Sequence, residues 1–256
     1  MNINNAMYDG MNWWDENADT ALLTTAVNPC RIRYFQRVLT EKVRLDPANV
    51  RVLDVGCGGG LLAEEFAKKG WKVTGVDQSA PSLALARAHA KEGGLDIDYH
   101  HSKAQTLPFD NASFDVVYCC DVLEHIADYP KAVAESARVL KTGGLYLYET
   151  LNRTWISKIV SIKLLQEWSL TRMIAEDVHD WDMFIKPEEL YAAFQQCRLQ
   201  NVETRGVSVV NPIEFAVAMF KYKRGQMSLA SLGRAAHATD TWDTTNGYLG
   251  FAIKTI

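Results

Sequence analysis

The sequence has few cysteines, no strongly basic run and no long apolar run. Its five cysteines are odd in number among 256 residues, and no Cys-x-x-Cys pair occurs. Neither a disulfide framework nor a zinc site is therefore predicted, and a reduced, cytoplasmic setting is favoured. The net charge of −4 and the missing basic run argue against a nucleic-acid partner. No apolar run approaches the roughly 20 residues that a membrane-spanning helix needs.

Length and composition favour a single globular domain. Hydrophobic residues make up 48% and charged residues 23% of the chain, which is ordinary for a soluble protein with a full core. We expect one domain over residues 1–256 with an N-terminal helical extension over residues 1–48. The first residues, Met1-Asn-Ile-Asn-Asn5, lack the charged and apolar regions of a signal peptide, so no leader is expected.

A glycine-rich stretch between a predicted strand and a predicted helix organises the chain. Residues 52–55 form a short β-branched run typical of a buried strand, and the amphipathic run 61–69 has helical spacing. Between them stand Gly56, Gly58, Gly59 and Gly60. Glycine allows a sharp turn and a close approach of backbone to a ligand. The free N–H groups of the following helix point to the same place.

The spacing of the glycines distinguishes between two classes of cofactor. A dinucleotide site needs Gly-x-Gly-x-x-Gly, but Leu61 stands where the third glycine belongs. Asp54, two residues before Gly56, disfavours a phosphate and suits the cationic methionine end of S-adenosylmethionine. A tight turn without any ligand is the alternative. Asp77 argues against that alternative, because it ends the next strand, where a carboxylate can accept both ribose hydroxyls.

Strands and helices alternate along most of the chain, which predicts an α/β fold. We expect a doubly wound, mostly parallel, seven-stranded sheet. Its strands are predicted at residues 52–55, 71–77, 97–101, 114–120, 145–150, 202–210 and 248–253. Two irregular insertions, residues 152–183 and 211–246, are long enough to form a helical lid.

Ligands of such sheets bind beyond the carboxyl ends of the strands. The candidate side chains there follow the first, second, fourth and fifth strands: Gly56, Asp77, Asp121, Glu124, His125 and Asn152. Gln78, Ala104 and Gln105 are further candidates for cofactor binding, because the loop over residues 102–111 is placed to read an adenine ring. Trp13 and Trp14 either cover the mouth of a pocket or pack on the surface of the domain.

These motifs resemble the class I S-adenosylmethionine-dependent methyltransferases, whose fold is Rossmann-like. The matching segments, in the order and spacing of that family, are residues 53–60, 73–77, 114–118 and 139–144. A closer resemblance is to the O-methyltransferases of ubiquinone biosynthesis. It is carried by residues 13–15, 28–31, 121–125, 150–153 and 179–187, and residues 211–213 match a further Asn-Pro-Ile segment. The chain departs from that family at Cys120, at Asp121 and over residues 214–243.

The resemblance implies that Arg31 and Gly56 hold the methionine end of the cofactor, with Gly58 in the same turn. It also implies that Asp77 holds the ribose and that Cys120 lies near the cofactor. The implied activity is methylation of a hydroxyl on an aromatic catechol or quinol, prenylated as in ubiquinone biosynthesis. Methyl transfer to another small molecule, such as a natural product or an amine, is the alternative. A non-enzymatic module that binds S-adenosylmethionine or a dinucleotide is the third interpretation.

Methyl transfer to a hydroxyl needs a group that removes the acceptor proton. His125 is the first candidate base, since its unperturbed pKa is about 6.5, and His179 is the second. Asp121, Glu124 and His125 are alternatively candidate ligands of a divalent cation, which would acidify a catechol hydroxyl. In a purely structural interpretation, Glu124 and His125 cap the turn after the strand.

The segment 154–178 is amphipathic and carries both tryptophan and lysine. Its apolar residues are predicted to lie largely on one side of a helix, a pattern that suits a membrane interface. A peripheral membrane contact would let the enzyme collect a prenylated acceptor. The alternatives are that this face covers the active site as a lid or packs against a second subunit. The oligomeric state is left open.

Overall fold

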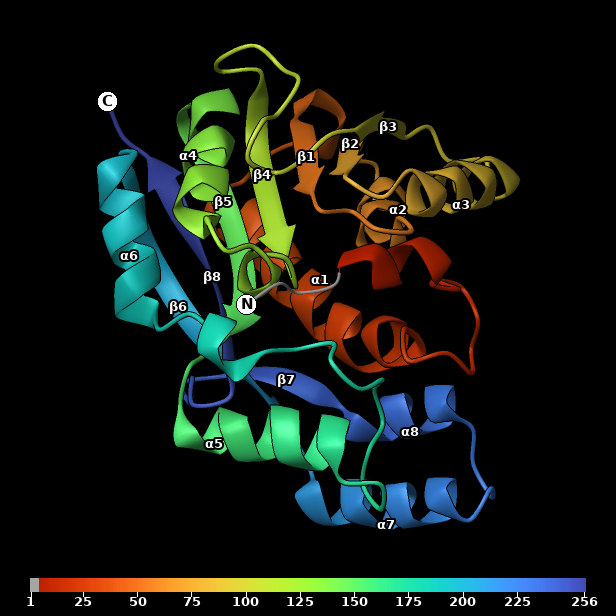
Figure 1. Ribbon diagram of the computed structural model, residues 1–256. Coiled ribbons are helices and arrows are strands. Elements are labelled where there is room, and N and C mark those ends of the chain that lie inside the picture. The colour runs from red at the N-terminus through yellow and green to blue at the C-terminus, as the bar shows by residue number, and fades with distance from the viewer. Residues whose placement is uncertain (1–4) are drawn as a thin grey trace.

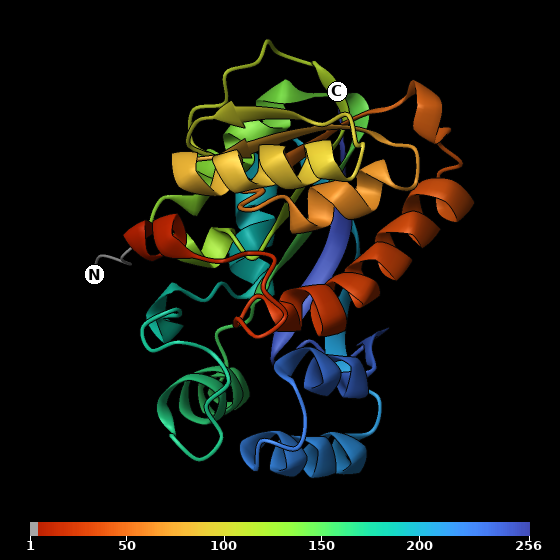
Figure 2. The ribbon, with the colours of Figure 1, turned by 90° about the vertical axis from the view of Figure 1, so that its right-hand side faces the viewer.

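A computed structural model describes residues 5–256 (Figures 1 and 2). The prediction that the chain starts without a leader is made from residues 1–5, most of which lie outside the described residues. One sheet holds the strands in the order β3-β2-β1-β4-β5-β8-β6-β7. Their bounds are β1 (Arg51–Val55), β2 (Lys72–Asp77), β3 (Asp98–His101), β4 (Phe114–Cys120), β5 (Leu140–Leu151), β6 (Leu199–Val209), β7 (Ala238–Thr241) and β8 (Gly247–Lys254).

Helices cover both faces of the sheet, and further helices lie in the two insertions. The α-helices are α1 (Asn28–Gln36), α2 (Leu61–Ala67), α3 (Ala80–Glu92), α4 (Tyr129–Val139), α5 (Trp155–Ser157), α6 (Pro187–Gln196), α7 (Pro212–Lys223) and α8 (Leu229–Ala236). The 3-10 and π segments are η1 (Asn5–Gly10), η2 (Leu23–Val27), η3 (Arg37–Lys42), η4 (Pro47–Asn49), η5 (Leu123–His125), η6 (Lys158–Glu167) and η7 (Trp181–Met183).

The predicted doubly wound, mostly parallel architecture is confirmed. Strands β3, β2, β1, β4 and β5 run parallel, whereas β8 is antiparallel to both of its neighbours, β5 and β6. Successive residues of β1 enter different cores, because side chains alternate between the faces of a strand. Val52 joins the core under α1, α2 and α3, and Leu53 joins the core under α4 and α6. Figure 1 shows the two helical layers on opposite sides of the sheet.

The sheet has eight strands rather than the predicted seven. The additional strand, β7, pairs antiparallel with β6 at the edge of the sheet. Its sequence, Ala238-Thr-Asp-Thr241, has no apolar alternation, because an edge strand needs to bury little surface. It lies inside the second predicted insertion, residues 211–246, which also holds α7 and α8. These two helices share a small core with Ala21 and Met173.

The first insertion, residues 152–183, differs from the predicted one-sided helix. After the short α5, the segment η6 is a π-helix with i+5 to i hydrogen bonds, such as that from Trp168 N to Lys163 O at 2.9 Å. Because a π-helix has a longer turn than an α-helix, side chains at α-helical spacing separate onto different sides. Ile162 is buried, whereas Trp155, Ile156 and Ile159 are exposed. In the described residues, no helix has both the length and the apolar character to cross a membrane.

Candidate active site

The predicted glycine turn joins β1 to α2 in a conformation that favours glycine. Gly56, Gly58 and Gly60 have φ angles of 80°, 51° and 83°. A Cβ atom on Gly56 would stand 2.3 Å from a methyl group of Val122, and one on Gly58 would stand 2.6 Å from the Trp13 ring. The turn is therefore restricted to glycine both by its backbone angles and by its neighbours.

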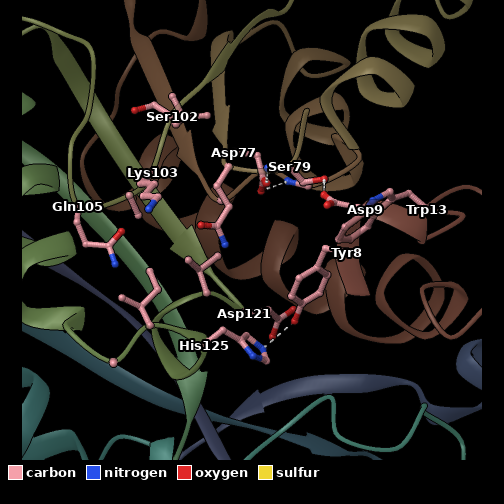
Figure 3. A pocket seen from close by; sticks show the side chains of 18 residues that line it. Tyr8, Asp9, Trp13, Asp77, Ser79, Ser102, Lys103, Gln105, Asp121 and His125 are labelled. Atoms are coloured by element: carbon pink, nitrogen blue, oxygen red, sulfur yellow. Dashed lines mark hydrogen bonds between the residues drawn. The ribbon is translucent and has the colours of Figure 1, made fainter. Parts of the chain in front are cut away.

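A cavity of about 530 Å³ opens beside this turn, at the carboxyl ends of β1, β2 and β4 (Figure 3). Asp77 lies in its wall, and its carboxylate accepts hydrogen bonds from the backbone N–H groups of Gly58 and Ser79, both at 2.8 Å. The cavity brings together six of the residues predicted for cofactor binding: Gly56, Gly58, Asp77, Gln78, Ala104 and Gln105. We call it the cofactor cavity.

The N-terminal strap, residues 8–13, closes one side of the cofactor cavity. The Trp13 Nε1 group donates to Ser82 Oγ at 2.9 Å, and Ser82 Oγ donates to the carbonyl oxygen of Tyr8 at 2.9 Å. Ser79 Oγ donates to the Asp9 carboxylate at 2.6 Å. The strap is thus tied to the first turn of α3, which Ser79 caps. Sequence reasoning anticipated Trp13 but missed Tyr8 and Asp9, which follow no strand and carry no motif.

A second cavity, of about 330 Å³ and mostly apolar lining, adjoins the first. It is lined by the N-terminal helices, the glycine turn and the first insertion, including Leu22, Leu23, Val27, Leu62, Leu151, Leu165, Ile174 and Val178. Arg31, Asp54, Cys120 and His179 line this cavity and not the cofactor cavity. The two cavities meet at Tyr8, Trp13, Gly56, Asp121 and His125, which line both. We call the second one the apolar cavity.

Arg31 pairs with two acidic side chains, Asp121 and Glu149, at the junction of the cavities, where Arg31 and Glu149 are buried and Asp121 is partly exposed. Its guanidinium contacts Asp121 Oδ2 at 2.5 Å, pairs with Glu149, and donates to Asn28 Oδ1 at 2.9 Å. Burial raises the pKa of Glu149 well above its usual range. Burial also acts to raise the pKa of Asp121, but the Arg31 guanidinium outweighs it and the pKa is lowered. Asp121, at φ 55°, is a non-glycine residue in left-handed backbone.

Asp54, the predicted charged partner of the cofactor, lies on β1 and lines the apolar cavity. Its side chain is buried, and it accepts a hydrogen bond from the Tyr118 hydroxyl at 2.9 Å. Burial raises its pKa to about 8. Near neutral pH the group is therefore largely protonated, because removing a carboxylate from water disfavours its charged form.

His125 stands at the junction of the cavities and contacts the strap through its Nε2 atom. Its Nε2 atom lies 3.3 Å from the Tyr8 hydroxyl, and its ring stacks on His179 with centroids 5.2 Å apart (Figure 3 shows the Tyr8 contact). Burial, with a contribution from His179, lowers the pKa of His125 to about 3. The imidazole is therefore neutral at physiological pH. Its low pKa also makes it a weak base, which the nearby Asp121 carboxylate partly offsets.

Three of the predicted site residues line neither cavity. Trp14 stacks on His89 with centroids 3.4 Å apart and donates to the Gly59 carbonyl oxygen. Asn152 donates to the Thr244 carbonyl oxygen at 2.9 Å and so links the bases of the two insertions. Glu124 is buried behind His125 and accepts a hydrogen bond from the Thr150 hydroxyl at 2.8 Å.

The position of Glu124 bears on the predicted metal site. Burial, then repulsion by Asp121, raises the pKa of Glu124 to about 8, so its carboxyl is largely protonated at neutral pH. Within residues 5–256, no group of three or more His, Cys, Asp or Glu side chains has an arrangement that would hold a metal ion. The residues present therefore do not fit the predicted divalent cation, and the chemistry below uses none.

Known proteins resemble this chain in sequence and in fold. Residues 53–148 match the model of a methyltransferase domain. The chain is 36% identical over 207 residues to the ubiquinone biosynthesis O-methyltransferase of Ruegeria sp. (strain TM1040), covering 78% of this chain and 82% of the relative. It is 37% identical over 209 residues to the protein of the same name from Ruegeria pomeroyi, covering 79% and 83%.

Two solved structures show the same fold at low sequence identity. An S-adenosylmethionine-dependent methyltransferase from Methanosarcina mazei superposes with a TM-score of 0.59 at 20% identity, covering 83% of this chain and 95% of that one. Another from Aquifex aeolicus gives a TM-score of 0.58 at 11% identity, covering 92% and 93%. The glycine turn, the sheet and the sequence relatives agree: the chain belongs to the class I S-adenosylmethionine-dependent methyltransferases and is an O-methyltransferase.

Proposed function

We propose that this enzyme methylates a hydroxyl group on an aromatic catechol or quinol that carries an apolar prenyl substituent. The observation that carries the proposal is the junction of a polar cofactor cavity with an apolar cavity at His125. The apolar lining suits a hydrocarbon chain, since burying it releases about 0.8 kcal/mol per CH₂ group. The name of the curated relatives, ubiquinone biosynthesis O-methyltransferase, supports the same acceptor class.

In this proposal the cofactor cavity holds S-adenosylmethionine across the glycine turn. Asp77 binds the ribose hydroxyls through its remaining lone pairs, while Gln78, Ala104 and Gln105 surround the adenine. The methionine end reaches past Gly56 toward Arg31, Asp54 and Cys120. S-adenosylmethionine, when bound, supplies an electrophilic methyl carbon on a sulfonium sulfur. The protein has to align the acceptor oxygen with that carbon and keep water out.

His125 is the proposed base that receives the acceptor proton. Its neutral imidazole lines both cavities, so the acceptor hydroxyl can reach its neighbourhood while the methyl group approaches from the cofactor cavity. Asp121, held by Arg31, stays ionised and stabilises the positive charge that develops on the imidazole. Glu124 has a supporting role, because its bond with Thr150 anchors the turn that carries His125.

A panel assay with labelled S-adenosylmethionine tests the acceptor class. Simple catechols, catechols with prenyl chains of increasing length, and amines are compared by kcat/KM. We expect methylated catechols, with kcat/KM rising as the chain lengthens until the cavity is filled. Preferential methylation of amines would contradict the proposal and would favour the alternative of a different small-molecule acceptor.

We also propose that the segment 154–178 contacts a membrane surface while it covers the apolar cavity. Ser161, Leu165, Ile174 and Val178 face the cavity, whereas Trp155 is 73% exposed and Trp168 54% exposed. Lys158 lies over the Trp155 and Trp181 rings, which places a cation beside exposed aromatic groups. Exposed tryptophan with lysine suits an interface that contains anionic lipid.

Flotation with vesicles that contain anionic lipid tests the membrane contact. The wild-type protein is expected to float at low salt, where electrostatic attraction is strongest, and a Trp155→Glu, Ile159→Glu double variant is expected not to float. Leu85→Glu is the matched control, because Leu85 is also an exposed apolar residue but lies on α3. A wild-type protein that stays in the soluble fraction at low salt would refute the contact.

A further inference from the structure

The Tyr8 side chain occupies the junction of the two cavities and contacts the proposed base. We propose that Tyr8 relays the proton of the acceptor hydroxyl to His125, with its own hydroxyl group as the intermediate station. This proposal deepens the proposed function and rests on it. It adds a catalytic residue from the N-terminal strap to the reaction centre that Asp121 and His125 form after β4.

The contact between the Tyr8 and His125 side chains has the geometry of a long, weak hydrogen bond. The Tyr8 hydroxyl oxygen and His125 Nε2 are 3.3 Å apart, and the rings meet edge to face at 79° with centroids 5.8 Å apart. Catalytic hydrogen bonds are often long before the ligands bind and shorten in the complex. Figure 3 shows the Tyr8 hydroxyl pointing toward the His125 ring.

The burial of His125 favours a relay over direct transfer. The imidazole is only 8% exposed, and its Nδ1 atom is buried without a hydrogen-bond partner in the described residues. Nε2 is therefore the nitrogen that faces a proton donor, and the Tyr8 hydroxyl already stands against it. Because Tyr8 also lines both cavities, its oxygen can meet an acceptor hydroxyl while it contacts Nε2.

The step balances without any additional reactant. As the acceptor oxygen bonds to the methyl carbon and the carbon–sulfur bond breaks, the acceptor O–H bond also breaks. Its proton joins the Tyr8 oxygen, and the proton that Tyr8 carried moves to His125 Nε2. Tyr8 ends as a neutral phenol and His125 as an imidazolium, which returns its proton to solvent after the product leaves.

The surroundings of Tyr8 disfavour a phenolate and so favour a relay that never charges the residue. Burial raises its pKa, and nearby carboxylates raise it further. The titratable groups that face the Tyr8–His125 couple are Asp77, Asp121, Glu124 and His179. Of these, Asp121 has a lowered pKa and is the charge best placed to stabilise the imidazolium.

The strap holds Tyr8 in place independently of its hydroxyl group. Its carbonyl oxygen accepts the bond from Ser82, and its ring stacks on Trp13 at 17° with centroids 6.1 Å apart. A Tyr8→Phe variant keeps both interactions and loses only the oxygen. This variant therefore separates a relay from a mere covering of the cavity.

Steady-state kinetics of Tyr8→Phe with catechols of graded acidity tests the relay. We expect kcat to fall roughly 10²-fold for an ordinary catechol, in the range of a lost acid–base group, and the loss to shrink for acidic nitrocatechols, which ionise unaided. The pH–rate profile of the variant should rise with acceptor ionisation. The affinity for S-adenosylhomocysteine should stay unchanged. Tyr129→Phe is the matched control, because Tyr129 opens α4 and lines neither cavity.

Nitrogen NMR of the His125 side chain, with S-adenosylhomocysteine bound, tests the contact without turnover. The Nε2 signal should shift between wild type and Tyr8→Phe and should stay in place in Tyr129→Phe. The relay is overturned if wild type methylates catechols and Tyr8→Phe matches it for every acidity, or if the Nε2 signal does not move. A wild-type protein that methylates amines but no catechol refutes instead the proposed acceptor class.

Discussion

Glu124 and His125 are neighbours in the chain, yet their side chains contact different parts of the molecule. Glu124 accepts a hydrogen bond from Thr150 in β5 at 2.8 Å, and His125 meets Tyr8 in the N-terminal strap at 3.3 Å. Both are buried, and burial shifts their pKa values in opposite directions, to about 8 for Glu124 and about 3 for His125. Each group is therefore uncharged near neutral pH, which has consequences for stability.

The joint contribution of Glu124 and His125 to the stability of the fold is predicted to pass through a maximum between about pH 4.5 and 6.5. Below about pH 6.5, His125 binds a proton in the unfolded state, whereas in the folded state it stays neutral until about pH 3. The free energy of unfolding therefore falls as the pH falls through this range. Above about 4.5 the unfolded state ionises Glu124 while the folded state holds its proton to about pH 8, so stability falls with rising pH. Each limb has a slope of up to about 1.4 kcal/mol per pH unit.

Urea unfolding from pH 4 to 8 measures both limbs. Glu124→Gln should make the alkaline limb less steep and His125→Gln the acid limb, because neither replacement titrates. Asp54 and Glu149, whose pKa values are also raised by burial, keep part of the alkaline limb. Identical pH dependence in wild type and both variants would show that these two groups do not control the profile.

Replacement of His125 by alanine is predicted to lower kcat by roughly 10²–10⁴-fold. The affinity for the cofactor should change little, because the imidazole lies at the junction rather than beside Asp77. Single-turnover kinetics with calorimetry of S-adenosylhomocysteine binding separates the two effects. Wild-type turnover in the variant would mean that the proton leaves by another route, and His179, which stacks on His125, is then the next base to replace.

The residues that follow strands were predictable, because the topology of a doubly wound sheet decides where strand ends gather. Asp77, Asp121 and His125 lie where the sequence placed them for this reason, as does the glycine turn at Gly56. The charge states were not predictable. Asp54 and Glu124 are themselves predicted site carboxylates, but their pKa values depend on burial that only the packed fold reveals.

Contacts between distant segments lay outside the reach of the sequence. Tyr8 meets His125 across 117 positions of the chain, and no spacing rule connects them. The π-helical η6 changed the side to which Ile162 and Ile159 point, because the prediction assumed α-helical spacing. Strand β7 was not predicted, because its four residues show no strand pattern and become a strand only through pairing with β6.

Asp77→Asn is predicted to weaken binding of S-adenosylhomocysteine by about 5- to 150-fold, equivalent to about 1–3 kcal/mol for lost hydrogen bonds to a charged group. The amide keeps one oxygen for the Gly58 or Ser79 N–H group but loses the charge and one acceptor. Calorimetry measures the affinity, and Asp98→Asn, at the exposed start of β3, is the control. NAD binding more tightly than S-adenosylhomocysteine would contradict the assignment of the cavity.

The contact between Gly58 and Trp13 makes a further prediction about stability. Gly58→Ala incurs the cost of left-handed backbone and also a clash, since the new Cβ would stand 2.6 Å from the Trp13 ring. Gly94→Ala incurs only the first cost, because Gly94 has a φ of 65° and no atom within 4 Å of the same position. Left-handed backbone costs roughly 1–2 kcal/mol, so Gly94→Ala should lose about that much.

Gly58→Ala should lose more stability than Gly94→Ala and should also weaken cofactor binding, because the turn has to open away from the strap. Adding Trp13→Ala to Gly58→Ala should recover the excess loss, since the ring that clashes with the new methyl group is gone. A double-mutant cycle by urea unfolding isolates this coupling. If the two glycine variants lose equal stability, or if Trp13→Ala gives no recovery, then the strap does not press on the glycine turn, and Gly58 is required for its backbone angle alone.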